Sequence, residues 1–476
     1  MNKLTQEQQK VVDTVLSATD ERIIAVNSIA GSGKTSTASA VINAYKPKNG
    51  FYTAFNKAIV TDSSRRFGNL LDCKTIHALA YSHIKPSKGI EDLTYLSIKE
   101  PISYEAKAKI IEIIDDFYRS SSLDINNFSA SRTDNEDIQQ LVFEYTSKML
   151  EGKIPVTFNY MLKCLHLMLA HKEIEIDYDL LILDECQDTT AVTLEIFKLM
   201  QANRKVMFGD KFQNIYSFMN TVNAFDELND LNLIRLTKSF RCNPYVADIV
   251  EQFGTSYLED DFMFKGNEDM NNAPKSMAYI SRTNAALIER MHELLNKGVT
   301  FSLTRHVNDI FALPIAVANA ACGNVVYDKK YKYLETEYRK YSSSPKTFKS
   351  FYEHLIYTVD DVSITNTIKT LMSFANKRIN IFKLKESVKN IRSNSNIILT
   401  TAHAFKGLEA DMVYIENDLN SSVNKTIQTI KDNITMFDNE FTTDDFLPSS
   451  QKEDLNTYYV ALSRARSGIT NVNYIG

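Results

Sequence analysis

The sequence contains no long apolar run, and that absence removes two classes of protein. No stretch approaches the roughly 18 uninterrupted apolar residues of a transmembrane helix. The first segment, MNKLTQEQQK, also lacks the apolar core of a signal peptide. Membrane spanning and secretion are therefore not expected, and we expect a cytoplasmic protein with no membrane partner.

Cysteine is also sparse, and its pattern excludes the usual cysteine-based scaffolds. The chain has five cysteines, an odd number, far apart and without a CxxC pair. Neither a disulfide framework nor a zinc site is expected from this spacing. We expect reduced thiols at all five positions, which are Cys73, Cys164, Cys186, Cys242 and Cys322.

An excess of positive charge is missing as well. Lys and Arg total 54 against 59 Asp and Glu, which gives a formal net charge of −5. Taken as an average, this balance argues against a nucleic-acid partner. A chain of 476 residues with 44% hydrophobic and 24% charged residues is an ordinary globular protein. At about 150 residues per domain, the length predicts about three domains.

Glycine is scarce, yet two glycines lie almost side by side. The chain has 14 glycines in 476 residues, against an average of about 7%. Gly31 and Gly33 follow the short apolar segment RIIAVN and precede TSTASAVINAY, whose apolar residues have near-helical spacing. The pattern predicts a strand, a glycine loop and a helix.

Short apolar runs of strand length recur along the chain, separated by longer segments of helical character. Their placement predicts two parallel sheets with crossover helices, and therefore the α/β class. The runs are FYTAF at 51–55, LLIL at 180–183, KVMF at 205–208, LIRL at 233–236, MAYI at 277–280, IIL at 397–399 and MVYI at 412–415.

Two stretches, 81–170 and 301–390, do not alternate in this way and are predicted to be mainly helical insertions. Within the first, the polar run at 120–137 predicts an exposed loop. The polar segment 417–452 is likewise predicted to be a surface loop.

The glycine loop, SIAGSGKT at 28–35, matches the phosphate-loop pattern except that Ser28 takes the first glycine position. Backbone N–H groups in such a loop point at phosphate oxygens, Lys34 supplies a positive charge, and Thr35 offers a hydroxyl to Mg²⁺. The alternative is a chance GKT in a strand-to-helix turn. The flanking strand and helix favour phosphate binding.

The segment LLILDECQD places two acids directly after an apolar strand. Desolvated carboxylates are costly there unless they hold a cation or another donor. We expect Asp184 to hold Mg²⁺ and Glu185 to orient the water that attacks a γ-phosphate. A solvated pair of acids at the strand end is the alternative.

Together with further motifs in order, DECQD resembles motif II of superfamily 1 helicases of the UvrD/Rep type. The later segments are GDKFQNIYSF at 209–218, LTKSFRC at 236–242, SRTN at 281–284, TAHAFKGLE at 401–409 and YYVALSRAR at 458–466. The resemblance covers nearly the whole chain, and an ordered set of this size is highly specific.

The resemblance implies two RecA-like P-loop NTPase cores with the ATP site between them, each carrying a mainly helical insertion. We expect the first core at 1–81 and 164–232, with an insertion at 82–163. The second core is expected at 233–300 and 391–476, with an accessory insertion at 301–390. No appended nuclease domain is expected.

The resemblance also assigns residues to ATP. Catalytic roles fall on Lys34, Asp184, Glu185, Gln213, Arg241 and Arg464, with Thr35 and Asp184 as ligands of Mg²⁺. Gln213 would sense the γ-phosphate, and the two arginines would neutralise charge in the transition state. A surface salt bridge is the alternative for each arginine. The residues implied to bind the nucleotide are Gln8, Ser28, Ile29, Ala30, Gly31, Ser32, Gly33, Lys34, Thr35, Ser36, Arg65, Phe240 and Glu409.

Three of these nucleotide contacts have structural alternatives. Gln8 matches the adenine-reading glutamine of the family, but with Thr5 it also forms a capping-box pattern. Arg65 is adjacent to Arg66 and can be confused with it. Phe240 stands where the family usually has a tyrosine that stacks on the base, and core packing is its alternative.

For DNA, the resemblance implies contacts from motifs Ia, Ib, III and V. Aromatic residues could stack on bases and polar ones bind phosphates, although aromatics at strand ends are as often core. The implied contacts are Phe55, Asn56, Thr75, His77, Tyr216, Phe218 and His403.

The chain departs from the family at several positions. Ser28 and Ile29 replace Ala and Gly, Phe218 replaces a common Trp, and Met219 replaces a common Arg. Tryptophan is absent from the whole chain. A phenylalanine can still stack on a base, whereas the Met219 change alters how motif III would couple ATP to the strand.

The segment 327–349 interleaves five tyrosines with seven Lys or Arg and three acids, so its local net charge is +4. It lies in the accessory insertion. A contact with nucleic acid and a solvated helix face are both consistent with this composition.

The expected function is an ATP-dependent DNA helicase that moves 3′ to 5′ on single-stranded DNA and unwinds duplex, the direction being implied by the family. The alternatives are a DNA-stimulated translocase that only displaces bound proteins and, least favoured, an ATP-gated scaffold without hydrolysis. Expected partners are single-stranded DNA, duplex junctions and replication or recombination proteins. We expect a monomer in a bacterial or phage-infected cytoplasm.

Overall fold

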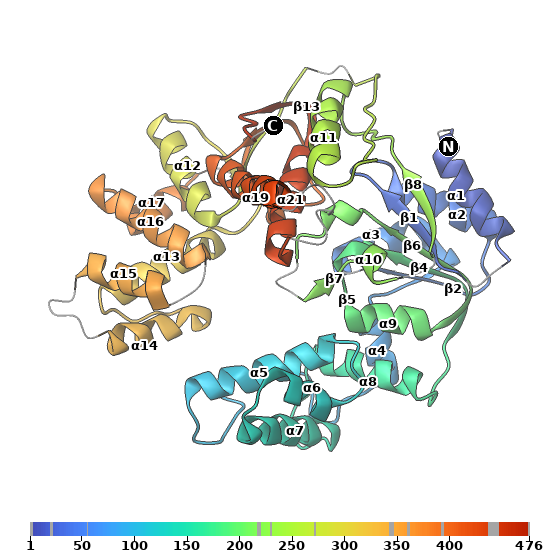
Figure 1. Cartoon of the computed structure of the whole chain (residues 1–476), viewed down its shortest axis with the longest axis horizontal. Coiled ribbons are helices and arrows are strands. Elements are labelled where there is room, and N and C mark those ends of the chain that lie inside the picture. Colours follow the sequence, from blue (N-terminus) through green and yellow to red (C-terminus); the bar gives the residue numbers. More distant parts are fainter. Residues whose placement is uncertain are drawn as a thin grey trace. The chain divides into compact units, whose positions relative to one another are not determined.

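Two parallel sheets organise the chain, one in each of two units, Met1–Lys238 and Ser239–Gly476 (Figure 1). The structure, a computed structural model, describes residues 3–19, 22–54, 56–216, 220–228, 231–270, 273–341, 347–358, 362–391, 395–436 and 447–474. The α/β class with parallel sheets, expected from the apolar runs, is confirmed.

The first unit contains a six-stranded sheet in the order β3-β2-β4-β6-β1-β8, and each neighbouring pair is parallel. A short antiparallel ladder joins β5 and β7. The strands are β1 (Ile24–Ser28), β2 (Gly50–Ala54), β3 (Asp72–Cys73), β4 (Asp177–Asp184), β5 (Thr189–Thr190), β6 (Gln201–Gly209), β7 (Thr221–Val222) and β8 (Asn232–Leu236).

Alternate residues of these strands are buried in two separate cores, one on each face of the sheet, because successive side chains of a strand point to opposite faces. Leu180 and Ile182 pack with α1, α2 and α3, whereas Leu181 and Leu183 pack with α4, α8 and α9. The helices of this unit are α1 (Gln6–Ser17), α2 (Lys34–Tyr45), α3 (Lys57–Phe67), α4 (Ile76–His83), α5 (Tyr104–Arg119), α6 (Ile125–Arg132), α7 (Glu136–Leu150), α8 (Phe158–Ala170), α9 (Ala191–Leu199) and α10 (Ala224–Glu227).

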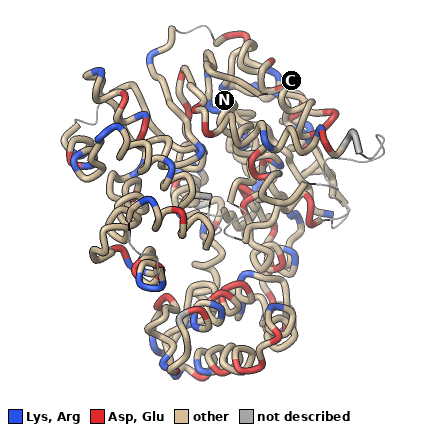
Figure 2. The backbone as a smooth tube through the Cα atoms, turned by 60° about the vertical axis from the view of Figure 1, so that its left-hand side comes forward, with Lys and Arg blue, Asp and Glu red and all other residues tan. Residues whose placement is uncertain are grey.

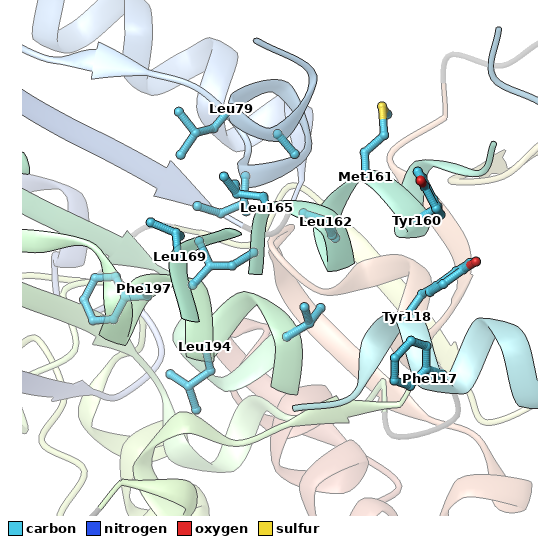
Figure 3. Packing of buried hydrophobic residues seen from close by; sticks show 14 of the residues in the cluster. Leu79, Phe117, Tyr118, Tyr160, Met161, Leu162, Leu165, Leu169, Leu194 and Phe197 are labelled. Carbon is cyan, nitrogen blue, oxygen red and sulfur yellow. The ribbon is translucent and has the colours of Figure 1, made fainter. Parts of the chain in front are cut away.

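Helix α8 connects the sheet to helices α5, α6 and α7. Its residues Leu165 and Leu169 are buried in the same cluster as Phe197 of α9 and Phe117 of α5 (Figure 3). Lysines and arginines are interspersed with acids along the chain (Figure 2). Helix α5 carries four acids and three Lys or Arg, whereas α7 carries three acids and one lysine.

The second unit contains a five-stranded parallel sheet in the order β10-β11-β9-β12-β13. Its strands are β9 (Met277–Ser281), β10 (Ser302–Leu303), β11 (Ile397–Thr401), β12 (Ala410–Ile415) and β13 (Ala465–Thr470). Its helices are α11 (Pro244–Tyr257), α12 (Asn284–Asn296), α13 (Val307–Ala321), α14 (Tyr333–Lys340), α15 (Phe348–Thr358), α16 (Val362–Asn376), α17 (Ile381–Lys389), α18 (Ala402–Phe405), α19 (Asn417–Met436) and α21 (Ser449–Leu462).

Part of the tyrosine-rich segment 327–349 belongs to the core of this unit. Tyr341 is buried, and the ring of Tyr338 packs edge-on against Phe351 at 5.2 Å between centroids. Tyr327, by contrast, is 86% exposed. Lys346 lies outside the described residues.

The boundary between the units differs from the sequence prediction. We expected 233–300 to open the second core, but β8 pairs along its whole length with β1 of the first sheet. The first unit accordingly extends to Lys238. The composition of an apolar run identifies a strand but does not say which sheet it joins, because pairing is decided by non-local contacts.

Two predicted loops also contain helices. The start of the segment 417–452 forms α19, which buries Leu419, Val423 and Ile427 at helical spacing. The run 120–137 contains α6, capped by Asp124 and anchored by the ring of Phe128 against Phe117. Both segments are mostly polar in composition, so the sequence predicted loops, but their few apolar residues lie on one narrow face of a helix.

None of the described helices is both long and apolar enough to cross a membrane.

A buried histidine in α8 predicts a pH dependence of stability. His166 is 2% exposed, and burial, with the charge of Lys163, lowers its pKa to about 4. Between pH 6.5 and 4 the unfolded chain therefore binds a proton that the folded chain does not. The free energy of unfolding should fall as the pH falls through this window, by up to about 3 kcal/mol.

The measurement is urea unfolding at pH 7, 5.5 and 4 for the wild type and His166→Leu. The variant should lose less stability than the wild type on acidification. His171→Gln, at the exposed C-cap of the same helix, is the control. Equal pH dependence in His166→Leu and the wild type would refute the assignment.

Candidate active site

The candidate site begins in the loop between β1 and α2. Gly31 and Gly33 have φ values of 75° and 84°, a left-handed conformation that glycine adopts without steric cost. Gly33 is the N-cap of α2, so Lys34 and Thr35 open the helix. Backbone N–H groups and the helix dipole at such an N-terminus favour an anion.

Lys34 is paired with the first acid after β4. Its Nζ lies 2.7 Å from Glu185 Oε1. Burial would lower the pKa of Lys34, but the charges of Glu185 and Asp184 outweigh that effect and raise it. The ammonium therefore stays charged, and it sits where a phosphate would meet both the lysine and the loop.

Asp184, the last residue of β4, is 6% exposed and held at both carboxylate oxygens. Oδ1 accepts a hydrogen bond from the backbone N–H of Glu185 at 2.9 Å, and Oδ2 accepts one from the Tyr52 hydroxyl. Burial and the charge of Glu185 raise the pKa of Asp184, while Lys34 and Tyr52 oppose the rise.

The backbone of Glu185 adopts a left-handed conformation, with φ 53° and ψ 44°. A non-glycine residue held there carries a cost of about 1 kcal/mol or more and is usually constrained by its surroundings. Side-chain contacts hold Glu185 at both oxygens: Lys34 Nζ donates to Oε1, and Gln187 Nε2 donates to Oε2 at 2.6 Å. The turn thus directs the Glu185 carboxylate towards Lys34.

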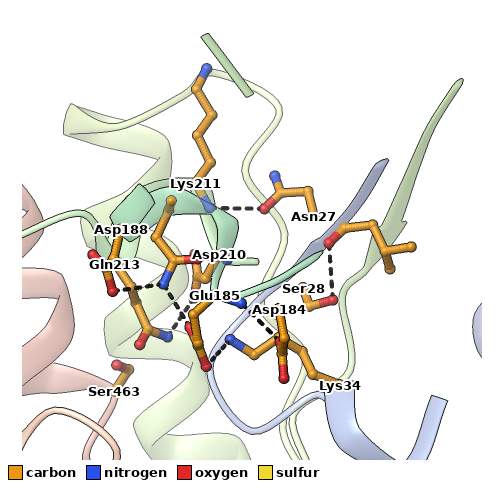
Figure 4. A network of polar contacts seen from close by, with 12 residues as sticks. Asn27, Ser28, Lys34, Asp184, Glu185, Asp188, Asp210, Lys211, Gln213 and Ser463 are labelled. Atoms are coloured by element: carbon orange, nitrogen blue, oxygen red, sulfur yellow. Dashed lines mark hydrogen bonds and ion pairs between the residues drawn. The ribbon is translucent and has the colours of Figure 1, made fainter. Parts of the chain in front are cut away.

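Gln187 and Asp210 extend the polar network to the end of β6 (Figure 4). Gln187 Oε1 accepts from the N–H of Asp210 at 3.1 Å, and Asp210 Oδ2 accepts from Gln213 Nε2 at 2.6 Å. The N–H of Lys211 donates to Asn27 Oδ1 on β1 at 3.1 Å. The carboxyl ends of β1, β4 and β6 are therefore joined through side chains.

The residues present suit a nucleotide phosphate with Mg²⁺. Ser32 Oγ in the loop is buried without a hydrogen-bond partner, and the next turn of chain brings Lys34 and the hydroxyl-bearing Thr35 at the start of α2. Among the described residues no group of three or more His, Cys, Asp or Glu forms a metal site of its own. Mg²⁺ commonly binds one or two protein groups together with phosphate oxygens, which matches Thr35 and Asp184.

Gln8 forms the predicted capping box and also contacts the glycine loop. The capping box is formed, because Thr5 N–H donates to Gln8 Oε1 at 3.0 Å and Gln8 N–H donates to Thr5 Oγ1 at 3.2 Å. Gln8 Nε2 also donates to the carbonyl of Ser32 in the loop, at 3.3 Å. Among the other predicted contacts, Ser28, Ile29 and Ala30 are buried at the start of the loop.

Two further predicted nucleotide contacts, Ser36 and Arg65, are exposed on α2 and α3. The neighbouring Arg66 is paired with Asp62 of its own helix at 2.7 Å. The guanidinium of Arg66 is thus engaged within α3.

In the second unit, Arg241 and Glu409 form an ion pair. Arg241 Nε lies 2.7 Å from Glu409 Oε2, and Arg241 Nη1 donates to the carbonyl of Ser463 at 3.2 Å. Arg466 binds the other oxygen of Glu409, and the two arginines lower the pKa of this glutamate against the effect of its burial. Phe240 beside them is 41% exposed.

Arg464, also predicted to reach the nucleotide, is 1% exposed. Its Nε donates to the carbonyl of Val460 at 3.0 Å and its Nη2 donates to Ser463 Oγ at 3.0 Å. The structure thus places this guanidinium at the C-terminal end of α21.

Three predicted DNA contacts lie at the starts of α3 and α4. Asn56 and Thr75 cap the N-termini of α3 and α4. His77 Nε2 lies 3.3 Å from Asn159 Oδ1, and burial lowers the pKa of this histidine. Two others, Phe55 and Phe218, lie outside the described residues.

The remaining two predicted DNA contacts have acidic neighbours. Burial, together with the charges of Asp188 and Glu185, raises the pKa of Tyr216 to about 12. In the second unit, His403 Nε2 lies 3.4 Å from Glu453 Oε1.

Sequence reasoning missed Tyr52, Gln187 and Asp210. Tyr52 lies in an apolar run and gave no sign other than a core strand. Gln187 and Asp210 stand inside the motifs DECQD and GDKFQ, so their position in those motifs could have identified them.

The glycine loop on β1, the acidic pair on β4 and the glutamine after β6 define a P-loop NTPase core of the α/β class. The parallel sheet of the second unit is consistent with a second RecA-like core.

The chain is also similar to a known domain family and to two known proteins. A family model described as an AAA domain matches residues 8–219. The chain is 23% identical to F-box DNA helicase 1 of Gallus gallus across 98% of its own length and 48% of that relative. It is 25% identical to F-box DNA helicase protein 1 of Schizosaccharomyces pombe, across 97% of its own length and 56% of the relative.

The chain thus spans about half the length of the curated relatives it matches. The matches indicate similarity, over nearly the whole chain, to proteins named as DNA helicases.

Gly209, at the end of β6, has no room for a side chain, and this allows a steric test of the site. A Cβ there would lie 2.6 Å from Cys186 Sγ and 2.6 Å from Gln187 Oε1. Gly209→Ala should therefore displace the turn after Glu185 and destabilise the protein by about 1–3 kcal/mol. Thermal and urea unfolding measure the loss.

The double variant Gly209→Ala/Cys186→Ala removes the sulfur that the new methyl group would meet. It should be more stable than expected from adding the two single effects. Strict additivity would show that the contact with Cys186 is not the cause.

Proposed function

We propose that this chain is an ATP-dependent DNA helicase. The observation that carries the proposal is the meeting of Lys34, Asp184, Glu185 and Gln213 at the carboxyl ends of β1, β4 and β6. Ligands of parallel α/β sheets bind at this edge. The near full-length similarity to two proteins named as DNA helicases supports the choice of polynucleotide.

In this proposal the loop 28–35 cradles the phosphates and Lys34 neutralises their charge. Thr35 and Asp184 would hold Mg²⁺, which neutralises charge on the β- and γ-phosphates. Gln8, which already contacts the loop at Ser32, would read the adenine. Its amide can both donate and accept, as the edge of adenine requires.

Glu185 is proposed to orient the attacking water. Its Oε1 is paired with Lys34, and a phosphate would compete for that same ammonium. The carboxylate would then accept a hydrogen bond from water, while Gln187 keeps its other oxygen in place. Gln213, tied to Asp210, would contact the γ-phosphate and report its loss.

The second unit is proposed to supply Arg241 and Arg464 to the nucleotide, with Phe240 against the base. Arg241 is pre-oriented by Glu409, which supports a role for that acid in fixing the guanidinium. Arg464 donates to Val460 and Ser463, so its contact with ATP would require those two bonds to open.

Single-stranded DNA is the proposed track, contacted by Phe55, Asn56, Thr75, His77, Tyr216, Phe218 and His403. Movement from 3′ to 5′, the UvrD/Rep type and action as a monomer in a bacterial or phage-infected cytoplasm remain part of the proposal. Its support is the ordered set of motifs. Unwinding of a forked duplex, assayed beside displacement of a bound protein, separates a helicase from a translocase that only strips proteins.

The first test is ATP turnover with and without single-stranded DNA. The wild type should be stimulated by DNA, and Lys34→Ala should lower the turnover by about 100-fold or more, because a charge that stabilises the transition state is removed. Lys10→Ala, on the exposed face of α1, is the matched control. Absence of stimulation would rule out a DNA motor, and unchanged turnover in Lys34→Ala would refute the phosphate loop.

The second test separates binding from hydrolysis. Glu185→Gln should retain ATP and DNA binding but lower hydrolysis by about 10²- to 10⁴-fold, since an amide cannot accept the proton from water. Filter retention of labelled ATP and single-turnover rates measure the two properties. Glu195→Gln on α9, a surface partner of Lys198, is the control. Hydrolysis at the wild-type rate would remove Glu185 from the mechanism.

A further inference from the structure

Tyr52 joins the acidic end of β4 to helix α3. In the parallel register of β2 and β4, Tyr52 lies beside Ile182, two residues before Asp184. Side chains two residues apart share a face of the sheet, so the Tyr52 ring extends along the face towards Asp184. The ring is 1% exposed and packs against Phe67 of α3, at 5.2 Å between centroids.

The Tyr52 hydroxyl donates to Asp184 Oδ2. A tyrosine hydroxyl carries its proton at neutral pH and is therefore a donor for this carboxylate. Since Oδ1 is held by the Glu185 N–H, removing the Tyr52 hydroxyl would leave one oxygen of a buried carboxylate without its donor.

We propose that Tyr52 is a positioning residue that fixes the carboxylate of Asp184 for Mg²⁺–nucleotide. This inference rests on the proposed function, in which Asp184 is a ligand of Mg²⁺. Groups that hydrogen-bond a ligating carboxylate fix its orientation, and their loss commonly costs about 10- to 100-fold in metal affinity. Tyr52 supplies that bond from a neighbouring strand, where its ring is already locked by packing.

The same side chain links Asp184 to α3. This helix begins after its N-cap Asn56, one of the proposed DNA contacts, and carries Phe67 in its last turn. Ser63, buried on α3, adds a side-chain hydrogen bond to Tyr52. A shift of α3 on DNA binding would therefore reach Asp184 through the ring and hydroxyl of Tyr52.

The test uses Tyr52→Phe in the full chain, which keeps the ring and removes only the hydroxyl. Binding of a fluorescent, non-hydrolysable ATP analogue is titrated with Mg²⁺. We expect the Mg²⁺ concentration at half-saturation to rise by about 10-fold or more. Tyr118→Phe is the matched control, a buried tyrosine of α5 whose hydroxyl contacts Met149 Sδ.

A residue that only fills the core would leave this Mg²⁺ dependence unchanged, because phenylalanine fills the same space. A half-saturation point within two-fold of the wild type therefore overturns the proposal, and so does wild-type nucleotide binding that is independent of Mg²⁺. If nucleotide binding depends on Mg²⁺ and Tyr52, but DNA never stimulates turnover, the helicase proposal fails while this inference stands.

A double-mutant cycle shows whether Tyr52 acts through Asp184. In the Asp184→Asn background, adding Tyr52→Phe should change Mg²⁺-dependent binding by less than two-fold, because the carboxylate that the hydroxyl positions is gone. An equal loss in both backgrounds would assign the effect of Tyr52 to packing. Thermal unfolding of each variant verifies that the comparison is made on folded protein.

Discussion

One half-buried ammonium, one half-buried carboxylate and one buried carboxylate share the carboxyl edge of the first sheet, where an isolated charge of either sign would be costly. Desolvating an isolated charge costs several kcal/mol or more, whereas a paired and hydrogen-bonded cluster recovers much of that cost. Lys34 meets Glu185 at 2.7 Å, and Asp184 is held by the Glu185 N–H and the Tyr52 hydroxyl. A bound phosphate would enter a site where the charge of Lys34 is already paired with Glu185. Binding of the phosphate would therefore replace a partner of Lys34 rather than add a new one.

This exchange of partners at Lys34 depends on a rigid network of side chains around Glu185. The left-handed turn at Glu185 is maintained by Gln187, which also reaches Asp210, and Asp210 in turn holds Gln213. Gly209 leaves room for this arrangement, since any larger residue would meet the side chains of Cys186 and Gln187. The acid proposed to orient water and the amide proposed to sense phosphate therefore belong to one connected network.

Much of this was accessible from the sequence because local patterns reported local structure. Apolar runs at 180–183 and 205–208 became β4 and β6, and the glycine pair became the loop before α2. Sheet membership was less accessible: LIRL at 233–236 formed a strand as expected but joined the first sheet through β1. The prediction of a surface loop was wrong for the α19 segment. Its few apolar residues are spread along one face of a helix and form no apolar run.

By itself, the sequence determined the class of the protein, its phosphate loop and the residue types of the site, because glycine conformations and strand-end acids follow from short segments. Only the tertiary structure decided that Tyr52 reaches Asp184, that Gln187 bridges Glu185 and Asp210, and that Arg241 is held by Glu409. These contacts join residues that are distant in the chain. Their partners are chosen by strand order and register, which no local pattern encodes.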